Sequence, residues 1–384
     1  MSGGGMQTRL VVGREDVLWL ERAPLPEAHG AEGLRFPEGE AAPSDEERGV
    51  WEARGDVQPT PQRFVRRRGD APRPGLERWT RDALRRAWAA GEVVLAPTVP
   101  PLAFDDVQDL GARVQAWEVG PGVRMLPVRT ATLPPATHTN TFLVGDDVVA
   151  LVEPAPRDEG ERALLARWLE EARRDGRRPR AVLATHHHPD HVAPGLAEAL
   201  GLPLWAHAET AARVDGAVAR TLRDGERVGL GERVLEALHT PGHAPGHLCF
   251  LEPETRLMIV GDMLAGVGTI LVEPRDGDMG RYLRSLQAMK AREPRGLLPA
   301  HGGLLADPAA RIDHYVAHRL MREEKVAAAL RAHGPASVRE LVPHAYDDAP
   351  KAVWGLAAMS LEAHLLKLEA DDRAARDGST WRAC

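Results

Sequence analysis

One short segment gathers four side chains that are able to bind metal. Residues 185–191 read Thr-His-His-His-Pro-Asp-His, so His186, His188, Asp190 and His191 follow the pattern His-x-His-x-Asp-His. Alternating His186 and His188 point to one side and converge on one ion, whereas Asp190 and His191 turn toward a second ion beside it. Imidazole and carboxylate groups are the ligands that zinc and similar divalent metals prefer. The segment therefore predicts metal binding.

Three more candidate ligands each follow a predicted strand. They are His243 in Thr-Pro-Gly-His, Asp262 in Gly-Asp, and His301 in Pro-Ala-His-Gly. A single histidine is more often a surface group than a ligand. Loops at strand ends gather around binding sites in layered α/β folds, however, and the first motif already predicts such a site. We therefore expect all three side chains to join it.

Alternating strands and helices must position these loops. An apolar strand over 181–184 leads directly into the histidine-rich segment, and a helix over 159–175 has an apolar face. The remaining elements of this region are strands at 123–126, 141–144, 148–152, 204–206, 234–238, 248–251, 257–260 and 297–299, and a helix at 282–290. The alternation predicts one layered α/β domain over residues 113–312.

From residue 313 onward the pattern is helical. A helix is expected over 315–332, and Ser337 with Glu340 forms a capping box that begins a second helix. Pro350 suits the first turn of a third helix, and a turn at Asp377-Gly378 follows it. Residues 313–384 are thus predicted to form a winged-helix-like domain.

Residues 1–112 differ from the rest and are rich in Pro, Arg and Glu. Leu10–Val12 and Val17–Leu20 favour a hairpin, and residues 78–90 favour a helix. We expect an α+β extension at the N-terminus.

Composition limits the classes of function. The 384 residues hold 49 Lys and Arg against 56 Asp and Glu, a net charge of −7 that gives no general argument for nucleic acid. Two cysteines exclude a disulfide framework, and no apolar run approaches the roughly 18 residues of a membrane span. The first 14 residues lack a secretory pattern. We expect a bacterial cytoplasmic protein without a membrane partner; a homo-oligomer stays open.

The seven candidate ligands together resemble the metal positions of the metallo-beta-lactamase superfamily, over roughly residues 120–330. That resemblance implies an αββα sandwich: two mixed sheets face to face, helices outside, and metals at one edge. It also implies the ligand sets, with His186, His188 and His243 on one metal, Asp190, His191 and His301 on the other, and Asp262 bridging both.

One position departs from the family pattern. Many members carry Asp-x-Gly after the second early strand, where this chain reads Val152-Glu153-Pro154-Ala155. The family's aspartate supports ligands from behind, so the change is expected to alter how the histidines are oriented. The bridging candidate Asp262, in turn, separates the chain from true beta-lactamases and favours the thioesterase and phosphodiesterase branches.

A finer resemblance is to the beta-lactamase-like protein 2 family, whose members include a single-strand-specific endoribonuclease. It is carried by Thr139–Gly145, by Gly261-Asp262 with the following Gly266–Thr269, and by His318-Arg319 with Arg322-Glu323. In that family the last motif leads into a winged helix. Fungal carrier-protein thioesterases of polyketide pathways resemble the same family.

These likenesses imply a dinuclear zinc hydrolase, with manganese or iron as alternative metals. A hydroxide that bridges two metals serves as nucleophile, and zinc lowers the pKa of its bound water to about 7. The catalytic candidates are Asp190, Asp262 and His247, the last expected to face the site and orient substrate or leaving group.

Three functions follow for comparison. The first, and the preferred expectation from the sequence, is a phosphodiesterase that resembles the single-stranded RNA endonuclease. The second is a thioesterase or small acyl-ester hydrolase, like glyoxalase II or a carrier-protein thioesterase. The third is a non-enzymatic winged-helix binding module with structural metals. Expected partners are accordingly a small ester or thioester, or single-stranded RNA.

The N-terminal region faintly resembles a Nudix hydrolase at Leu34–Gly39 and between Trp79 and Thr98. The acidic metal-binding box of that family is missing. We therefore expect a non-catalytic remnant that caps the site or forms a dimer surface.

Overall fold

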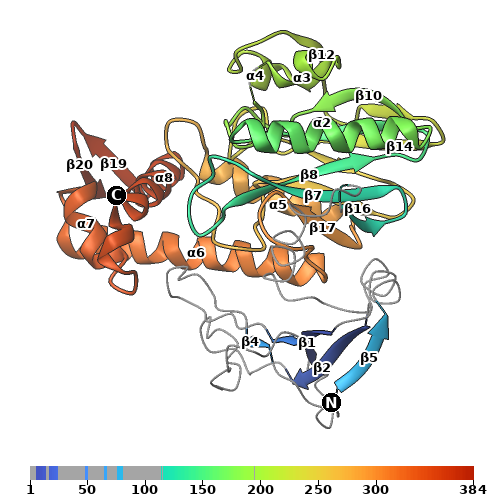
Figure 1. Cartoon of the computed structure of the whole chain (residues 1–384). Coiled ribbons are helices and arrows are strands. Elements are labelled where there is room, and N and C mark those ends of the chain that lie inside the picture. The colour runs from blue at the N-terminus through green and yellow to red at the C-terminus, as the bar shows by residue number, and fades with distance from the viewer. Residues whose placement is uncertain are drawn as a thin grey trace.

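The fold is that of a computed structural model, which describes residues 6–13, 17–24, 48–50, 65–66, 76–80, 114, 116–193 and 195–384. Figure 1 shows two stacked sheets with helices on their outer faces, and a helical C-terminal part reached through the long helix α6.

The first large sheet is mixed and has the order β12-β11-β10-β9-β8-β7-β6. Its strands are β6 Trp117–Gly120, β7 Val123–Arg129, β8 His138–Val144, β9 Val148–Val152, β10 Arg178–Leu183, β11 Leu204–His207 and β12 Val218–Leu222. Pairing is antiparallel from β6 to β9 and parallel from β9 to β12. Helix α2, Glu159–Arg174, begins at Asp158, whose side chain accepts a hydrogen bond from the Glu161 amide. Two short helices, α3 Leu196–Ala199 and α4 Ala208–Ala211, lie near β11 in the chain.

The second large sheet has the order β13-β14-β15-β16-β17. Its strands are β13 Arg227–Leu230, β14 Arg233–His239, β15 Leu248–Leu251, β16 Leu257–Gly261 and β17 Gly296–Pro299. Only β16 and β17 pair in parallel, across the connection that contains helix α5, Met279–Ala291. Helix α6, Pro308–His333, follows β17.

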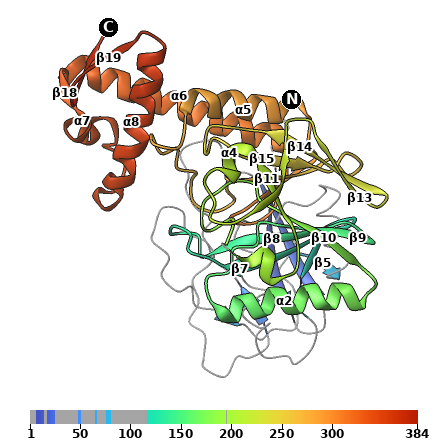
Figure 2. The same ribbon diagram turned by 90° about the horizontal axis from the view of Figure 1, so that it is seen from above.

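The main core lies between the two sheets. It joins Met125 and Phe142 of the first sheet to Leu235 and Phe250 of the second, all at most 1% exposed. On the outer faces, α2 packs on the first sheet, and α5 and α6 pack on the second. Figure 2 shows α2 on one side of the strands and α5 with α6 on the other. The expected αββα sandwich is confirmed.

The C-terminal part has the predicted winged-helix architecture. After α6 come β18 Ala336–Ser337, α7 Val338–Ala345, the 3-10 turn Lys351–Val353, α8 Trp354–Ala370, β19 Ala374–Asp377 and β20 Thr380–Ala383. The strands form a small sheet in the order β18-β20-β19. The capping box of Ser337 and Glu340 is present at the start of α7.

Two helix boundaries differ from expectation. Helix α6 begins at Pro308 rather than near residue 315, because the Asp307 side chain caps it and proline suits the first turn. It therefore runs through the predicted domain boundary at residue 313. Helix α8 begins at Trp354, since a 3-10 turn occupies the residues directly after Pro350.

The described part of residues 1–112 consists of strands. These are β1 Met6–Gly13, β2 Val17–Pro24, β3 Arg48–Val50, β4 Val65–Arg66 and β5 Leu76–Thr80, in the sheet order β4-β3-β1-β2-β5. The predicted hairpin of β1 and β2 is confirmed.

The helix predicted over 78–90 is wrong at its start. Residues 78–80 belong to β5, because they pair with β2 in an antiparallel register. The rest of that helix and most of the Nudix-like segments, including Leu34–Gly39, lie outside the described residues.

Among the helices that are described, none combines the length and apolar character of a membrane span. The cytoplasmic location stays a prediction.

Candidate metal centre

All seven predicted ligands lie in loops at one edge of the sandwich. The histidine-rich segment follows β10, His243 follows β14, Asp262 follows β16, and His301 follows β17. Their imidazoles and carboxylates form contacting groups, although they come from four separate parts of the chain. The structure thus brings together the side chains that the strand-end argument predicted to converge, and their role as metal ligands stays a prediction.

Three ring nitrogens form the first cluster. His186 Nε2 lies 2.9 Å from His188 Nδ1, and His243 Nε2 lies 3.2 Å and 3.0 Å from these two atoms. Three nitrogens bound to one tetrahedral zinc would lie roughly 3.3 Å apart. The cluster therefore has nearly the size of a three-histidine metal site.

Asp190, His191 and His301 form the second cluster. The two Asp190 oxygens lie 3.6 Å from His191 Nε2 and 3.6 Å from His301 Nε2. This is the group that the resemblance assigned to the other metal.

Asp262 lies between the clusters. Its Oδ2 is 3.6 Å from His243 Nε2 in the first cluster and 3.5 Å from His191 Nε2 in the second. Its Oδ1 is 3.4 Å from His301 Nε2. One carboxylate therefore faces ligand candidates of both clusters, as a bridging group must.

Backbone carbonyls fix two of the histidine tautomers. His243 Nδ1 donates to the Leu271 carbonyl at 2.8 Å, and His301 Nδ1 donates to the His138 carbonyl at 2.9 Å. A carbonyl only accepts, so the proton of each neutral ring is on Nδ1. The lone pair on Nε2 then faces the cluster, which is the arrangement a metal ligand requires.

Asp276 fixes the tautomer of His188, although no sequence pattern indicated this role. His188 Nε2 donates to Asp276 Oδ2 at 2.9 Å, which leaves Nδ1 for the cluster. His187, which alternates away from the cluster, lies 3.2 Å from the same oxygen. Burial opposes the charge on Asp276, but the hydrogen bonds from both histidines outweigh it and hold its pKa below the ordinary value. Asp276 lies in a polar loop 88 residues from His188, so residue spacing in the sequence could not identify it as a partner of that histidine.

Glu153, at the position that departs from the family pattern, supports both clusters. His191 Nδ1 donates to Glu153 Oε1 at 2.8 Å, and the Thr185 hydroxyl donates to the same oxygen. Thr185 in turn accepts from His186 Nδ1 at 3.0 Å. Glu153 is fully buried, and its backbone adopts a φ of 59° at the end of β9. Glu153 thus supplies a carboxylate that orients His191. The sequence signal for this role was a glutamate directly after the apolar run of β9.

His247 does not offer a free nitrogen to a substrate. Its Nε2 accepts from the Asp262 amide at 3.2 Å, so its Nδ1 donates to the Thr240 hydroxyl at 2.8 Å. The ring is completely buried and packs beside His186. This geometry holds the backbone of Asp262 in place.

Burial and charge set the protonation states of the cluster. Burial lowers the pKa of His243 to about 4 and that of His186 well below its ordinary value, so both rings are neutral. Burial also lowers the pKa of His191, but Asp190, Asp262 and Glu153 outweigh this and raise it. For Asp262, His191 and His301 outweigh burial and hold the pKa well below its usual range. Neutral His186 and His243 beside the ionised Asp262 are in the states that bind a cation, whereas the protonated ring of His191 must release its proton when a metal binds.

The residues present fit a pair of divalent cations. His191 Nε2 and Asp262 Oδ1 are buried and have no hydrogen-bond partner in the structure. Buried polar atoms without a hydrogen-bond partner are uncommon in proteins, so these two atoms indicate a binding site for a ligand. Five imidazoles and two carboxylates are also the donor set that zinc, manganese or iron would accept.

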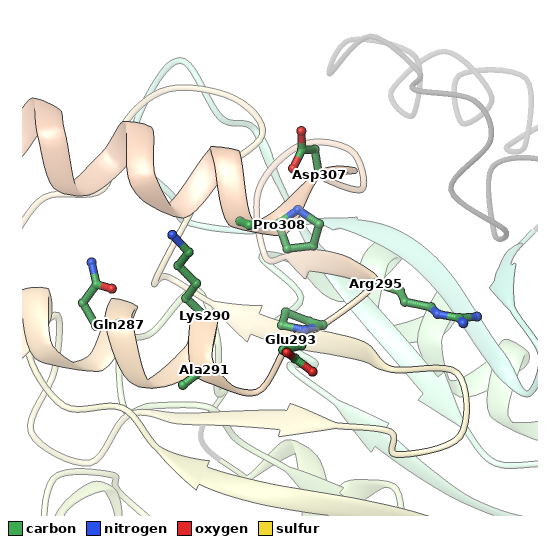
Figure 3. A pocket seen from close by; sticks show the side chains of 9 residues that line it. Gln287, Lys290, Ala291, Glu293, Arg295, Asp307 and Pro308 are labelled. Carbon is green, nitrogen blue, oxygen red and sulfur yellow. The ribbon is translucent and has the colours of Figure 1, made fainter. Parts of the chain in front are cut away.

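A surface cavity lies elsewhere on the layered α/β domain. It measures about 820 Å³ and is lined by α5 and the start of α6, near the beginning of β17 rather than its end. Figure 3 shows Gln287 and Lys290 on one side and Asp307 with Pro308 on the other. Lys290 is already paired with Asp313 at 2.6 Å. The residues that line the cavity include no histidine or cysteine, so the chemistry belongs to the metal-ligand edge.

Comparison with known families agrees with the two parts of the fold. Residues 134–301 match the metallo-beta-lactamase superfamily, and residues 337–381 match the beta-lactamase associated winged helix domain.

Curated relatives are similar over much of the chain. The lactamase-like protein notP of Aspergillus sp. (strain MF297-2) is 30% identical over 59% of this chain and 74% of its own length. An atrochrysone carboxyl ACP thioesterase of Aspergillus chevalieri is 32% identical over 51% and 64%. A beta-lactamase-like protein 2 homolog of Drosophila melanogaster is 29% identical over 36% and 47%, so the chain spans about half of that relative.

A solved structure has the same fold. A metallo-beta-lactamase family protein of Thermus thermophilus superposes with a TM-score of 0.58 at 26% identity, over 69% of this chain and 99% of that one.

Proposed function

The chain belongs to the metallo-beta-lactamase superfamily and is a metal-dependent hydrolase, and from this premise we propose a dinuclear centre that hydrolyses acyl thioesters or related esters. The observation that carries the dinuclear part is the position of Asp262 between the two clusters. Because the chain is a hydrolase, the alternative of a non-enzymatic binding module is set aside.

The two cations would be held by all seven side chains. His186, His188 and His243 would hold the first, Asp190, His191 and His301 would hold the second, and Asp262 would contact both. Zinc is the proposed metal, and the same donors also suit manganese or iron. When bound, the pair supplies a water nucleophile at neutral pH and electrostatic stabilisation of the developing negative charge.

The protein's own part is to orient these groups. Glu153 and Asp276 hold three histidines in the tautomers that offer a lone pair. Asp190 and Asp262 carry negative charge that offsets the cations. We assign His247 a positioning role behind Asp262, in place of the direct catalytic role expected from the sequence.

The winged helix supports the choice of an acyl substrate. In DNA-binding helix-turn-helix proteins, the second helix of the pair enters the major groove. The corresponding helix α8 is instead buried along much of its surface: Leu361 and Leu365 pack in the winged-helix core, and Ala363 joins the apolar cluster beneath α5, whereas Leu356 is exposed. The only Lys or Arg residue of α8, Lys367, pairs with Glu323 and Asp371.

Charge in this domain supports the same choice. Residues 313–384 hold ten Lys and Arg side chains against eleven Asp and Glu. Several of the basic groups are engaged inside the domain, including Arg322 with Asp348 and Lys325 with Asp347. Nucleic-acid binding depends on basic groups that are available to phosphates. The relative that is described as an ACP thioesterase adds a likeness in sequence.

Single-stranded RNA is the second candidate substrate. The resemblance to the beta-lactamase-like protein 2 family favours it, because that family includes a single-strand-specific endoribonuclease and a homolog of it is 29% identical over 36% of this chain. The same pair of cations would serve a phosphodiester as well as an acyl carbonyl.

One experiment separates the two substrates. Zinc-loaded protein is offered an acyl-pantetheine thioester and, separately, an unstructured single-stranded RNA, with Asp190→Ala and Asp262→Ala proteins purified in parallel. We expect the thioester to be hydrolysed by the wild type and by neither variant. RNA cleavage that both variants lose, without thioester hydrolysis, would contradict the proposed substrate.

A further inference from the structure

The motif His318-Arg319 with Arg322-Glu323 has no part in the metal centre described above. It lies on α6, and two of its side chains, Arg319 and Glu323, are each only 4% exposed. Charged groups are rarely buried without a partner, so both positions require an explanation. Their partners lie in different domains.

Arg319 and its neighbour Tyr315 hold a segment that we call the strap, residues 265–271. The Tyr315 hydroxyl accepts from the Ala265 amide at 3.0 Å and donates to the Ala265 carbonyl at 3.2 Å. The Arg319 guanidinium donates to the Ile270 carbonyl and lies 5.4 Å from the Tyr282 ring centre. Both ends of the strap are therefore fixed to one face of α6.

The strap in turn contacts a ligand candidate of each cluster. Its Gly266 amide donates to the His301 carbonyl at 2.7 Å, and its Leu271 carbonyl accepts from His243 Nδ1 at 2.8 Å. The contact with the His301 loop is tight, since a Cβ on Gly302 would lie 2.6 Å from backbone atoms of Gly266. A shift of the strap would therefore move His243 and the backbone of His301 together.

Glu323 links the same helix to the winged helix. Its carboxylate lies 2.8 Å from Arg373, just before β19, and 2.9 Å from Lys367 on α8. Arg319 and Glu323 are four residues apart and so are neighbours on one face of α6, where Arg319 holds the strap and Glu323 holds the winged helix.

We propose that this turn of α6 couples the winged helix to the metal centre, with Tyr315 and Arg319 as positioning residues for His243 and His301. The proposal rests on the proposed metal function. Groups that orient metal ligands from behind typically change metal affinity by about 10- to 100-fold when they are removed. A purely structural role would change the stability of the fold and leave metal affinity as it is.

The test measures zinc affinity by calorimetry and the visible absorption of the cobalt(II)-loaded protein, which reports ligand geometry. The variants are Arg319→Met and Tyr315→Phe. Arg322→Met is the matched control, because Arg322 lies on the same helix but pairs with Asp348 away from the strap. Glu323→Gln tests the link to the winged helix.

We expect Arg319→Met to weaken zinc binding about 10-fold and to alter the cobalt spectrum, with smaller changes of the same kind in Tyr315→Phe and Glu323→Gln. Arg322→Met should match the wild type. Tyr315→Phe removes a single hydroxyl and keeps the test valid if Arg319→Met does not fold. Folded Arg319→Met and Tyr315→Phe proteins with wild-type affinity and spectrum would overturn the proposal. A wild type that binds no metal would instead overturn the proposed function.

Discussion

At the metal-ligand edge, buried polar side chains face one another across a few ångströms, whereas the core of the winged helix is almost entirely apolar. His186, His191 and Asp262 point into a common space, and their partners behind them are also polar. In the winged helix, Trp381, Leu361 and Leu365 fill the interior, and the charged groups pair mainly at its surface.

The difference concerns what each region requires of its residues. Polar groups buried together without solvent oppose folding unless a bound partner compensates them. An apolar core tolerates exchange among similar side chains if volume is kept. Substitutions at the edge should therefore change metal binding and turnover, whereas substitutions in the apolar core of the winged helix should change mainly stability.

The largest effect is expected for Asp262→Ala. Loss of the carboxylate shared by both clusters removes several kcal/mol of stabilisation from the reaction, so turnover should fall by about 10³-fold or more. Steady-state hydrolysis of the substrate identified above measures this. Asp313→Ala, which removes an exposed carboxylate far from the edge, is the control and should keep full activity. Comparable activity in the two variants would contradict the claim that the metal-ligand edge carries out the reaction.

A smaller effect is expected for Glu153→Leu, which keeps the volume but removes the acceptor for His191 and Thr185. Zinc affinity should fall by about 10- to 100-fold because two histidines lose their orientation. Calorimetric titration of metal-free protein measures the change. Glu153→Gln retains an acceptor oxygen and should lose less; equal affinity in the leucine variant and the wild type would show that Glu153 serves only packing.

These two residues show what the sequence could and could not predict. Asp262 was predicted to lie at the metal-ligand edge because it follows a strand end and matches a family pattern. Glu153 appeared as a departure from that pattern, and only the structure shows it bonded to His191. Asp276 and the role of His247 could not be predicted, because their partners come from loops far away in the chain.

The fold was predictable to a similar degree. Apolar runs identified the central strands, whereas the edge strands β6, β12 and β13 were missed because each is only four or five residues long and mixes polar and apolar side chains. In the winged helix, the capping box of Ser337 located α7 to the residue. The start of α6 was missed because its first turn packs on the hydrolase domain, beyond the helical pattern of the sequence.

A test within the helical region concerns acid stability. Burial, with help from Arg319, lowers the pKa of His364 from 6.5 to about 3. Between these values the unfolded chain binds a proton that the folded chain does not, so the free energy of unfolding decreases as the pH falls below 6.5. At about 1.4 kcal/mol per pH unit, the loss between pH 7 and pH 5 is about 2 kcal/mol.

His364→Leu should remove this loss, since leucine does not titrate. Urea unfolding of wild type and variant at pH 7 and pH 5, both in chelator so that metal release does not contribute, measures the difference. Both ring nitrogens of His364 lack a hydrogen-bond partner, so the variant should remain folded at pH 7. An equal loss of stability in the two proteins would contradict the assigned pKa.

The smallest effect is expected for Ser337→Ala. The Ser337 hydroxyl and the Glu340 carboxylate cap α7 reciprocally, and loss of such a cap costs about 1 kcal/mol of stability. Thermal unfolding measures the loss, and Ser337→Thr should restore most of it. Turnover should stay at the wild-type value; a fall in turnover of the folded variant would extend the coupling through α6 to the far end of the winged helix.

The most direct test of the account is to locate the metals. Crystals of zinc-loaded protein, measured on both sides of the zinc absorption edge, give anomalous difference maps that identify zinc by element. We predict two peaks per chain, one among His186, His188 and His243 and one among Asp190, His191 and His301, with Asp262 touching both. A single peak, or two peaks of which Asp262 contacts only one, would contradict the bridged dinuclear centre.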